Sequence, residues 1–202
     1  MKKMLLFCFF LQFSMVYAQE GKSSEFEKTG TELFYSNDFV GALPYFEKAL
    51  EQNPKSAKNH YFLGEINFKL ERTKVAMDNY NKAIELDTVN FTYYKDRGRL
   101  KAHLKDYRGS IADFNKSLEI SPDFSDALFD RALSNYQLKQ YSDCISDFTR
   151  VIENNPKDKE AFYSRGSAKI DSGDLIGGCT DWSRAGELGF IKAYETIQKK
   201  CN

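Results

Sequence analysis

The chain has 202 residues, of which 42% are hydrophobic and 15% aromatic, which is enough for a packed core and argues against global disorder. Its 29 basic residues balance its 29 acidic residues. This balance gives no support for nucleic acid or an anionic membrane as a partner, because both require a basic surplus on one face.

Residues 1–18 have the pattern of a secretory signal peptide: two lysines near the start, an apolar run over residues 4–13, and Ala18 before the expected cleavage site. The run is too short for a permanent bilayer anchor, and an uncleaved anchor helix is the alternative interpretation. We therefore expect an exported protein, periplasmic or secreted, with a short N-terminal linker at residues 19–22 and no integral membrane segment after cleavage.

The next 168 residues, 23–190, repeat with a period of 34. The period places small residues in two columns and aromatic residues in a third. These columns are Gly30, Gly64, Gly98, Ala132 and Gly166; Ala42, Ala76, Ser110, Cys144 and Gly178; and Phe46, Tyr80, Phe114, Phe148 and Trp182. The repeats extend over about 23–56, 57–90, 91–124, 125–158 and 159–190. Chance does not align this many positions by both size and chemistry.

Each repeat is predicted to form two helices. In the third repeat, apolar residues at three- and four-residue spacing predict helices over residues 91–104 and 107–120. Asp38, Asp106 and Asp174 follow the breaks and are predicted to cap the second helices. The small columns predict close approach of two helix backbones, with the aromatic column filling the space beyond.

Three arginines interrupt the apolar face of the first helices, and three aspartates follow them at a constant distance of 16 residues. The pairs are Arg97 with Asp113, Arg131 with Asp147, and Arg165 with Asp181. The midpoint of each pair falls on the predicted turn, at Lys105, Lys139 and Gly173, so the partners should meet across an antiparallel hairpin. We interpret them as structural ion pairs in which the guanidinium binds a carboxylate through two hydrogen bonds. The alternative is a row of arginines that binds an acidic or phosphorylated ligand.

The cysteines of the mature chain are Cys144, Cys179 and Cys201. Cys144 lies in a small-residue column and is expected to be a buried packing residue. Cys179 and Cys201 have their midpoint beside the turn at Gly189, which precedes a predicted C-terminal capping helix within residues 191–202. The same hairpin argument makes them a candidate disulfide in an oxidising compartment, with two free thiols as the alternative.

The first repeat carries Gly30, Ala42, Phe46, Ala49 and Pro54, a pattern that resembles the tetratricopeptide repeat (TPR) signature. The segment GGCTDWSRAGELG, residues 177–189, resembles the closing repeat of small exported bacterial proteins of this family. The resemblance implies an all-α fold: a right-handed superhelical solenoid of about five helix-turn-helix units with a C-terminal capping helix. It also implies a concave groove for peptides or protein segments and no enzymatic activity.

In such a superhelix, one face of each first helix lines the groove. The candidate peptide-binding residues on these faces are Tyr61, Lys95, Arg99, His103, Phe129 and Tyr163. Tyrosine and arginine are frequent in binding hot spots. A basic centre flanked by aromatic rings predicts an extended ligand with an acidic group or a free carboxylate.

The sequence contains no motif for catalysis, metal binding or nucleotide binding, so we expect no enzyme, no cofactor and no metal site. An envelope hydrolase on a helical scaffold is the poorest of the alternatives. The predicted function is a non-enzymatic interaction module that binds another protein or peptide in the cell envelope. The main alternative is a structural subunit of a larger envelope or secreted assembly.

Overall fold

The computed structural model describes residues 24–201, so the predicted signal peptide and the linker at residues 19–22 lie outside the described residues. Within this range the regular structure is entirely helical, which confirms the predicted all-α class. Residues 24–35 are helical and lead into α2. The helices that follow are α2 (Phe39–Gln52), α3 (Ala57–Lys69), α4 (Thr73–Leu86), α5 (Phe91–His103), α6 (Tyr107–Ile120), α7 (Ser125–Gln137), α8 (Tyr141–Asn154), α9 (Lys159–Asp171), α10 (Leu175–Glu187) and α11 (Lys192–Lys200).

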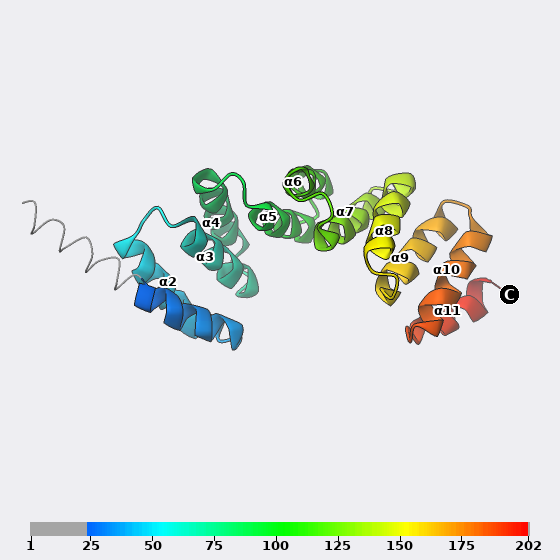
Figure 1. Ribbon diagram of the computed structural model, residues 1–202, viewed down its shortest axis with the longest axis horizontal. Helices are drawn as coiled ribbons and strands as arrows, with labels where there is room; N and C mark the ends of the chain where they lie inside the picture. Colours follow the sequence, from blue (N-terminus) through cyan, green and yellow to red (C-terminus); the bar gives the residue numbers. More distant parts are fainter. Residues whose placement is uncertain (1–23, 202) are drawn as a thin grey trace, which may run out of the picture. The chain divides into compact units, whose positions relative to one another are not determined.

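The chain forms two compact units that divide between Val89 and Asn90. In the first unit, α2 contacts α3 and α3 contacts α4. In the second unit, each helix from α5 to α11 contacts the next one along the chain, and α5 also contacts α7 (Figure 1). Consecutive helical hairpins therefore stack on their neighbours within this unit, as in a TPR solenoid. None of the helices between residues 24 and 201 has both the length and the apolarity that crossing a bilayer requires.

Tight turns join the two helices of each hairpin, and one residue in each turn has a left-handed backbone. These residues lie 34 apart: Asn37, Glu71, Lys105 and Lys139 at φ between 59° and 64°, and Gly173 at φ 100°. In the third hairpin, the amide of Asp106 donates back to the carbonyl of Lys101 over 2.9 Å, which is the bond that ends a helix in the Schellman motif. The side chain of Asp106 then accepts from the amide of Gly109, so one short segment ends α5 and caps α6.

The predicted caps are confirmed at all three positions. Asp38, Asp106 and Asp174 accept from backbone amides in the first turns of α2, α6 and α10. Because a side-chain acceptor satisfies an amide that the helix itself leaves unpaired, each cap fixes where its second helix begins.

The glycine and aromatic columns fit one another across the hairpins. A Cβ atom on Gly98 would lie 2.7 Å from the ring of Phe114, and one on Gly166 would lie equally close to the ring of Trp182. These two rings are almost completely buried, at 0% and 2% exposed. The predicted role of the small residues is confirmed, because a larger side chain at Gly98 or Gly166 would displace the central ring of its hairpin.

Candidate functional site

The structure brings together the partners of all three predicted ion pairs. Arg131 donates from Nε and Nη2 to the two carboxylate oxygens of Asp147 over 2.8 and 2.6 Å. Arg97 and Arg165 make the same pair of bonds to Asp113 and Asp181, at distances between 2.7 and 2.9 Å. The three aspartates are almost fully buried, whereas the arginine side chains retain 14–21% exposure.

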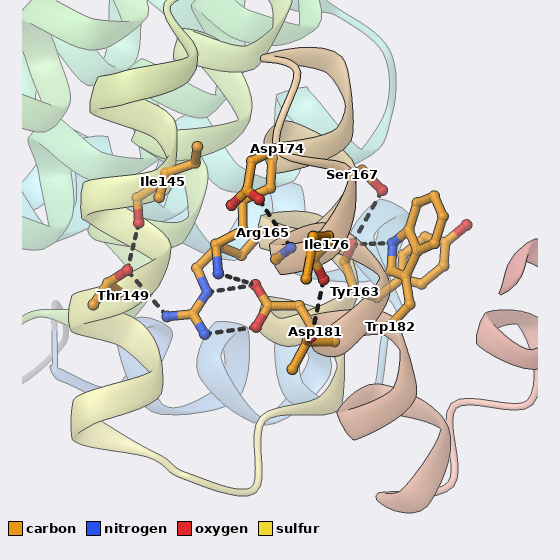
Figure 2. A network of polar contacts seen from close by, with 12 residues as sticks. Ile145, Thr149, Tyr163, Arg165, Ser167, Asp174, Ile176, Asp181 and Trp182 are labelled. Carbon is orange, nitrogen blue, oxygen red and sulfur yellow. Dashed lines mark hydrogen bonds and ion pairs between the residues drawn. The ribbon is translucent and has the colours of Figure 1, made fainter. Parts of the chain in front are cut away.

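The third nitrogen of the arginine fork connects neighbouring hairpins, a contact that the sequence analysis missed. Arg165 Nη1 donates to Thr149 on α8 over 3.1 Å while its other nitrogens bind Asp181 on α10 (Figure 2). Arg131 Nη1 donates likewise to Asn115 on α6 over 2.6 Å. Asn115 and Thr149 lie 34 residues apart, so a polar column at this spacing was the signal that could have revealed them.

Two lysines add a second cation to two of the aspartates. Lys101 Nζ lies 2.8 Å from Asp113 Oδ2, and Lys169 Nζ lies 2.9 Å from Asp181 Oδ2. With both the guanidinium and an ammonium bound, these carboxylates hold the arginines in place as part of the interior. This geometry supports internal bracing over the alternative of a ligand-binding row of arginines.

A second set of charged residues lies on α5 and α7, and we call Lys95, Asp96, Arg99 and Asp130 the α5–α7 charge cluster. Asp96 Oδ1 lies 2.6 Å from Lys95 Nζ and 3.3 Å from Arg99 Nη1. Arg99 Nε also lies 3.7 Å from Asp130 Oδ2 on the neighbouring first helix. The cluster therefore includes two of the six predicted groove residues, Lys95 and Arg99, and links two first helices.

Asp130 titrates abnormally within this cluster. Burial raises the pKa of its carboxyl from 3.8 to about 6, against the opposing effect of the positive charges of Arg99 and Lys95. The negative charges of Asp126 and Asp96 add to the rise of the pKa. Asp130 therefore changes its charge just below neutral pH.

The expectation of an exposed basic centre is wrong for Lys95. Its side chain is buried against the rest of the protein, 9% of the residue is exposed, and its ammonium lies over the ring of Phe124. Arg99 remains accessible, with 44% of its side chain exposed. Because Asp96 contacts both cations, the centre is a mixture of charges with one accessible guanidinium.

The predicted aromatic residues serve mainly in packing. The ring of Phe129 lies edge-on to the buried Phe148, with 5.1 Å between centroids. Tyr163 lies 5.9 Å from the ring of Trp182 and 4.7 Å from that of Phe190, and its hydroxyl lies 3.2 Å from Thr196 Oγ1 on α11. Tyr163, which was expected to face a ligand, thus contacts the C-terminal helices.

The other two predicted groove residues are not part of the α5–α7 charge cluster. Tyr61 belongs to the first unit, where its ring packs against Phe62 and Tyr80. His103 is the last residue of α5 and is exposed.

The cysteines are placed as follows. Cys179 on α10 and Cys201 after α11 form a disulfide, with 6.0 Å between their Cα atoms. Cys144 is fully buried, and burial raises the pKa of its thiol to about 12. A thiol with so high a pKa carries almost no thiolate at neutral pH, so Cys144 acts as a packing residue.

Among the described residues, no group of three or more histidine, cysteine, aspartate or glutamate side chains is arranged to hold a metal ion. The buried carboxylates of Asp113, Asp147 and Asp181 are instead bound by arginine. This arrangement suits noncovalent recognition of a charged segment by Arg99 and Asp130.

Comparisons with known proteins agree with this architecture. Profiles described as tetratricopeptide repeat match residues 28–91, 92–124 and 126–158. No curated protein sequence matches the chain.

Several solved structures resemble it at low sequence identity. The MamA protein aligns with a TM-score of 0.74 and 18% identity, over 88% of this chain and 94% of that chain. YrrB, described as a TPR protein with an unusual peptide-binding site, aligns with a TM-score of 0.77 and 18% identity, over 92% and 97%. PilF of Pseudomonas aeruginosa aligns with a TM-score of 0.78 and 16% identity, over 90% and 86%. At these identities the likeness concerns the fold alone.

Proposed function

This chain belongs to the tetratricopeptide repeat family, and from that premise we propose that it is a non-enzymatic module that binds a peptide or protein segment in the cell envelope. The α5–α7 charge cluster carries the proposal. It joins two consecutive first helices and presents the accessible guanidinium of Arg99 beside a carboxylate, Asp130, that titrates near pH 6.

The cluster favours a partner segment with an acidic side chain or a free C-terminal carboxylate. The buried Asp96 orients Arg99, and Lys95 in turn holds Asp96 in place. A carboxylate of the partner would bind Arg99 in competition with Asp130, at a distance where a charge-assisted hydrogen bond forms. Binding at this cluster depends on how well the groups of the partner fit Arg99 and Asp130, and less on a large positive electrostatic field.

Two observations support export. The N-terminal residues have the pattern of a signal peptide. The disulfide between Cys179 and Cys201 is a bond that persists in an oxidising compartment such as the periplasm. Mass spectrometry of the protein purified from its native host tests this point, and the expected mature N-terminus is Gln19.

The binding proposal is tested by capture from an envelope extract on the immobilised mature chain. Arg99→Glu reverses the accessible charge of the cluster and should abolish capture of the specific partner. Arg108→Glu is the matched control, because Arg108 is an exposed arginine on the second helix α6. Captured proteins that are identical for all three baits would contradict the proposal.

The observation that favours the alternative, a structural subunit, is the high exposure of two isoleucines, one on α10 and one just before α11. Ile176 is 83% exposed and Ile191 is 76% exposed. Size-exclusion chromatography with light scattering gives the oligomeric state of the mature chain and thereby distinguishes the two functions. A monomer that binds added peptides supports the module, whereas a stable oligomer that Ile176→Glu dissociates supports the subunit.

A further inference from the structure

The three braced hairpins of the second unit differ at one position. Lys101 and Lys169 bind Asp113 and Asp181, but the equivalent residue of the α7–α8 hairpin is Asn135. Among the described residues, the one cation that pairs with Asp147 is Arg131. The place that a lysine ammonium occupies in the two sister hairpins is therefore not filled by a lysine here.

A pocket of about 300 Å³ lies at this place, between α6, α7 and α8. Its lining includes Asn115, Arg131, Asn135, Asp143, Ser146 and Asp147. Asn135 is only 5% exposed, lines the pocket and makes no side-chain hydrogen bond within residues 24–201, yet its amide atoms are not among the fully enclosed polar atoms that lack a partner, so they open onto the pocket. An otherwise buried side chain that directs an unpaired amide into a pocket can bind a polar ligand there.

The charge of the lining selects a cation. Asp143 and Asp147 contribute two carboxylates, whereas the single guanidinium, that of Arg131, is already bound to Asp147 and Asn115. Acceptors from the amide of Asn135 and the hydroxyl of Ser146 surround the same space. A divalent metal is disfavoured, because no group of three metal-binding side chains occurs among the described residues.

We propose that this pocket binds a primary ammonium group on an alkyl chain, in the position that Lys101 and Lys169 fill in the sister hairpins. The ammonium donates its three hydrogens to Asp147, Asp143 and the amide oxygen of Asn135. Ile111, which also lines the pocket, provides an apolar contact for the alkyl chain. A lysine side chain of a partner protein and a free alkylamine share this chemistry.

The site is separate from the α5–α7 charge cluster, with which it shares no residue. It could therefore bind an ammonium even if Arg99 contacts no partner, and failure of either proposal leaves the other standing.

The test is a titration of the mature, oxidised chain with n-butylammonium, followed by the amide and side-chain NMR signals. The expected result is a saturable shift of the Asn135 side-chain amide and of backbone signals around Asp143 and Ser146. Butan-1-ol, the neutral analogue, should leave these signals unchanged. Equal shifts with both compounds, or shifts that are absent from α7 and α8, would overturn the proposal.

Three variants sharpen the test. Asn135→Lys supplies the missing ammonium from within the chain and should weaken n-butylammonium binding at least tenfold without lowering the Tm. Asp143→Asn removes an exposed carboxylate and should also weaken binding by tenfold or more. Lys101→Asn is the control: the position equivalent to Asp143 is Gly109 in that hairpin, so no second site should appear and the shifts should stay on α7 and α8. Unchanged affinity in both Asn135→Lys and Asp143→Asn would refute the proposal.

The source of the ammonium is decided by two further ligands. A capped peptide with one internal lysine represents a partner protein, and pentane-1,5-diamine represents a free amine. If the peptide binds more tightly than n-butylammonium, and acetylation of its lysine abolishes that binding, the site belongs to a partner protein. Tighter binding of the diamine assigns it to a small molecule, and either result supports the ammonium pocket.

Discussion

Three of the four buried aspartates of the second unit, Asp113, Asp147 and Asp181, each neutralise an arginine from the opposite helix of their hairpin. Asp181 accepts two hydrogen bonds from Arg165 and also lies 2.9 Å from Lys169 Nζ. A buried pair of this kind adds little net stability, yet removal of one partner leaves an uncompensated charge in the interior. The pair therefore specifies which helices associate more than it stabilises them.

Replacement of one partner should consequently cost more than replacement of both. We expect Asp181→Asn to lower the free energy of unfolding by about 3–5 kcal/mol, measured by urea denaturation with circular dichroism. Arg165→Leu combined with Asp181→Asn copies Leu63 and Asn79 of the second repeat and should recover at least half of that loss. A double variant as unstable as the single one would show that the pair contributes more than charge compensation.

The abnormal carboxyl of Asp130 makes stability depend on pH. Its folded-state pKa of about 6 lies above 3.8, so the folded chain binds more protons than the unfolded chain between these values and loses stability as the pH rises through them. The shift corresponds to at most about 3 kcal/mol. The stability of the natural chain relative to Asp130→Asn should therefore fall between pH 4 and pH 7. Parallel urea titrations of the two proteins at several pH values measure this difference, and a constant difference would exclude a raised pKa.

Whether the contacts of these residues can be predicted from the sequence depends on the geometry that produces each contact. Arg97 and Asp113 could be paired because antiparallel helices bring residues equidistant from a turn to the same level. This rule does not predict the contact of Lys101, because its long side chain reaches Asp113 from a position one helical turn closer to the loop of the hairpin. Lys95 was expected to be accessible and is buried, because helical periodicity predicts a face but not the direction in which a long side chain folds.

At the scale of the helices, the sequence predicted the fold with small errors. The structure places α5 at Phe91–His103 and α6 at Tyr107–Ile120, against predicted helices over 91–104 and 107–120. Caps and small-residue columns are local signals, so they define the ends and the contacts of a helix well. The packing of Tyr163 against Phe190 and Thr196 depends on how α11 docks, which local patterns do not specify.

The disulfide attaches the last helix to the hairpin before it. It joins residues 22 apart, and closure of such a loop stabilises the folded chain by about 3 kcal/mol in the chain-entropy account. Reduction, or Cys201→Ser, should release α11 first, because α10 is the helix it contacts. Hydrogen exchange should show lost protection over residues 192–200 and little change in α5 to α8. Loss of protection throughout the second unit would instead make the bond essential to the whole stack.

At the scale of the whole molecule, the buried ion pairs of the second unit serve in packing, and recognition of an acidic partner belongs to the surface. The buried arginines of the second unit are already paired with aspartates, so an acidic group of a partner has to bind at an accessible cation such as Arg99. The binding surface that we propose is therefore the face of α5 that carries Arg99. The neutral overall charge of the chain agrees with this, because specific contacts rather than a strong electrostatic field then select the partner.

Site-specific photocrosslinking in the native compartment tests this claim most directly. A photoreactive amino acid is placed at His103, which is exposed at the end of α5, and in a second protein at Arg108, which is exposed on α6. The account predicts a discrete crosslinked partner from position 103 that disappears when Arg99→Glu is added, and none from position 108. A partner captured from position 108 alone, or one from position 103 that persists with Arg99→Glu, would contradict it.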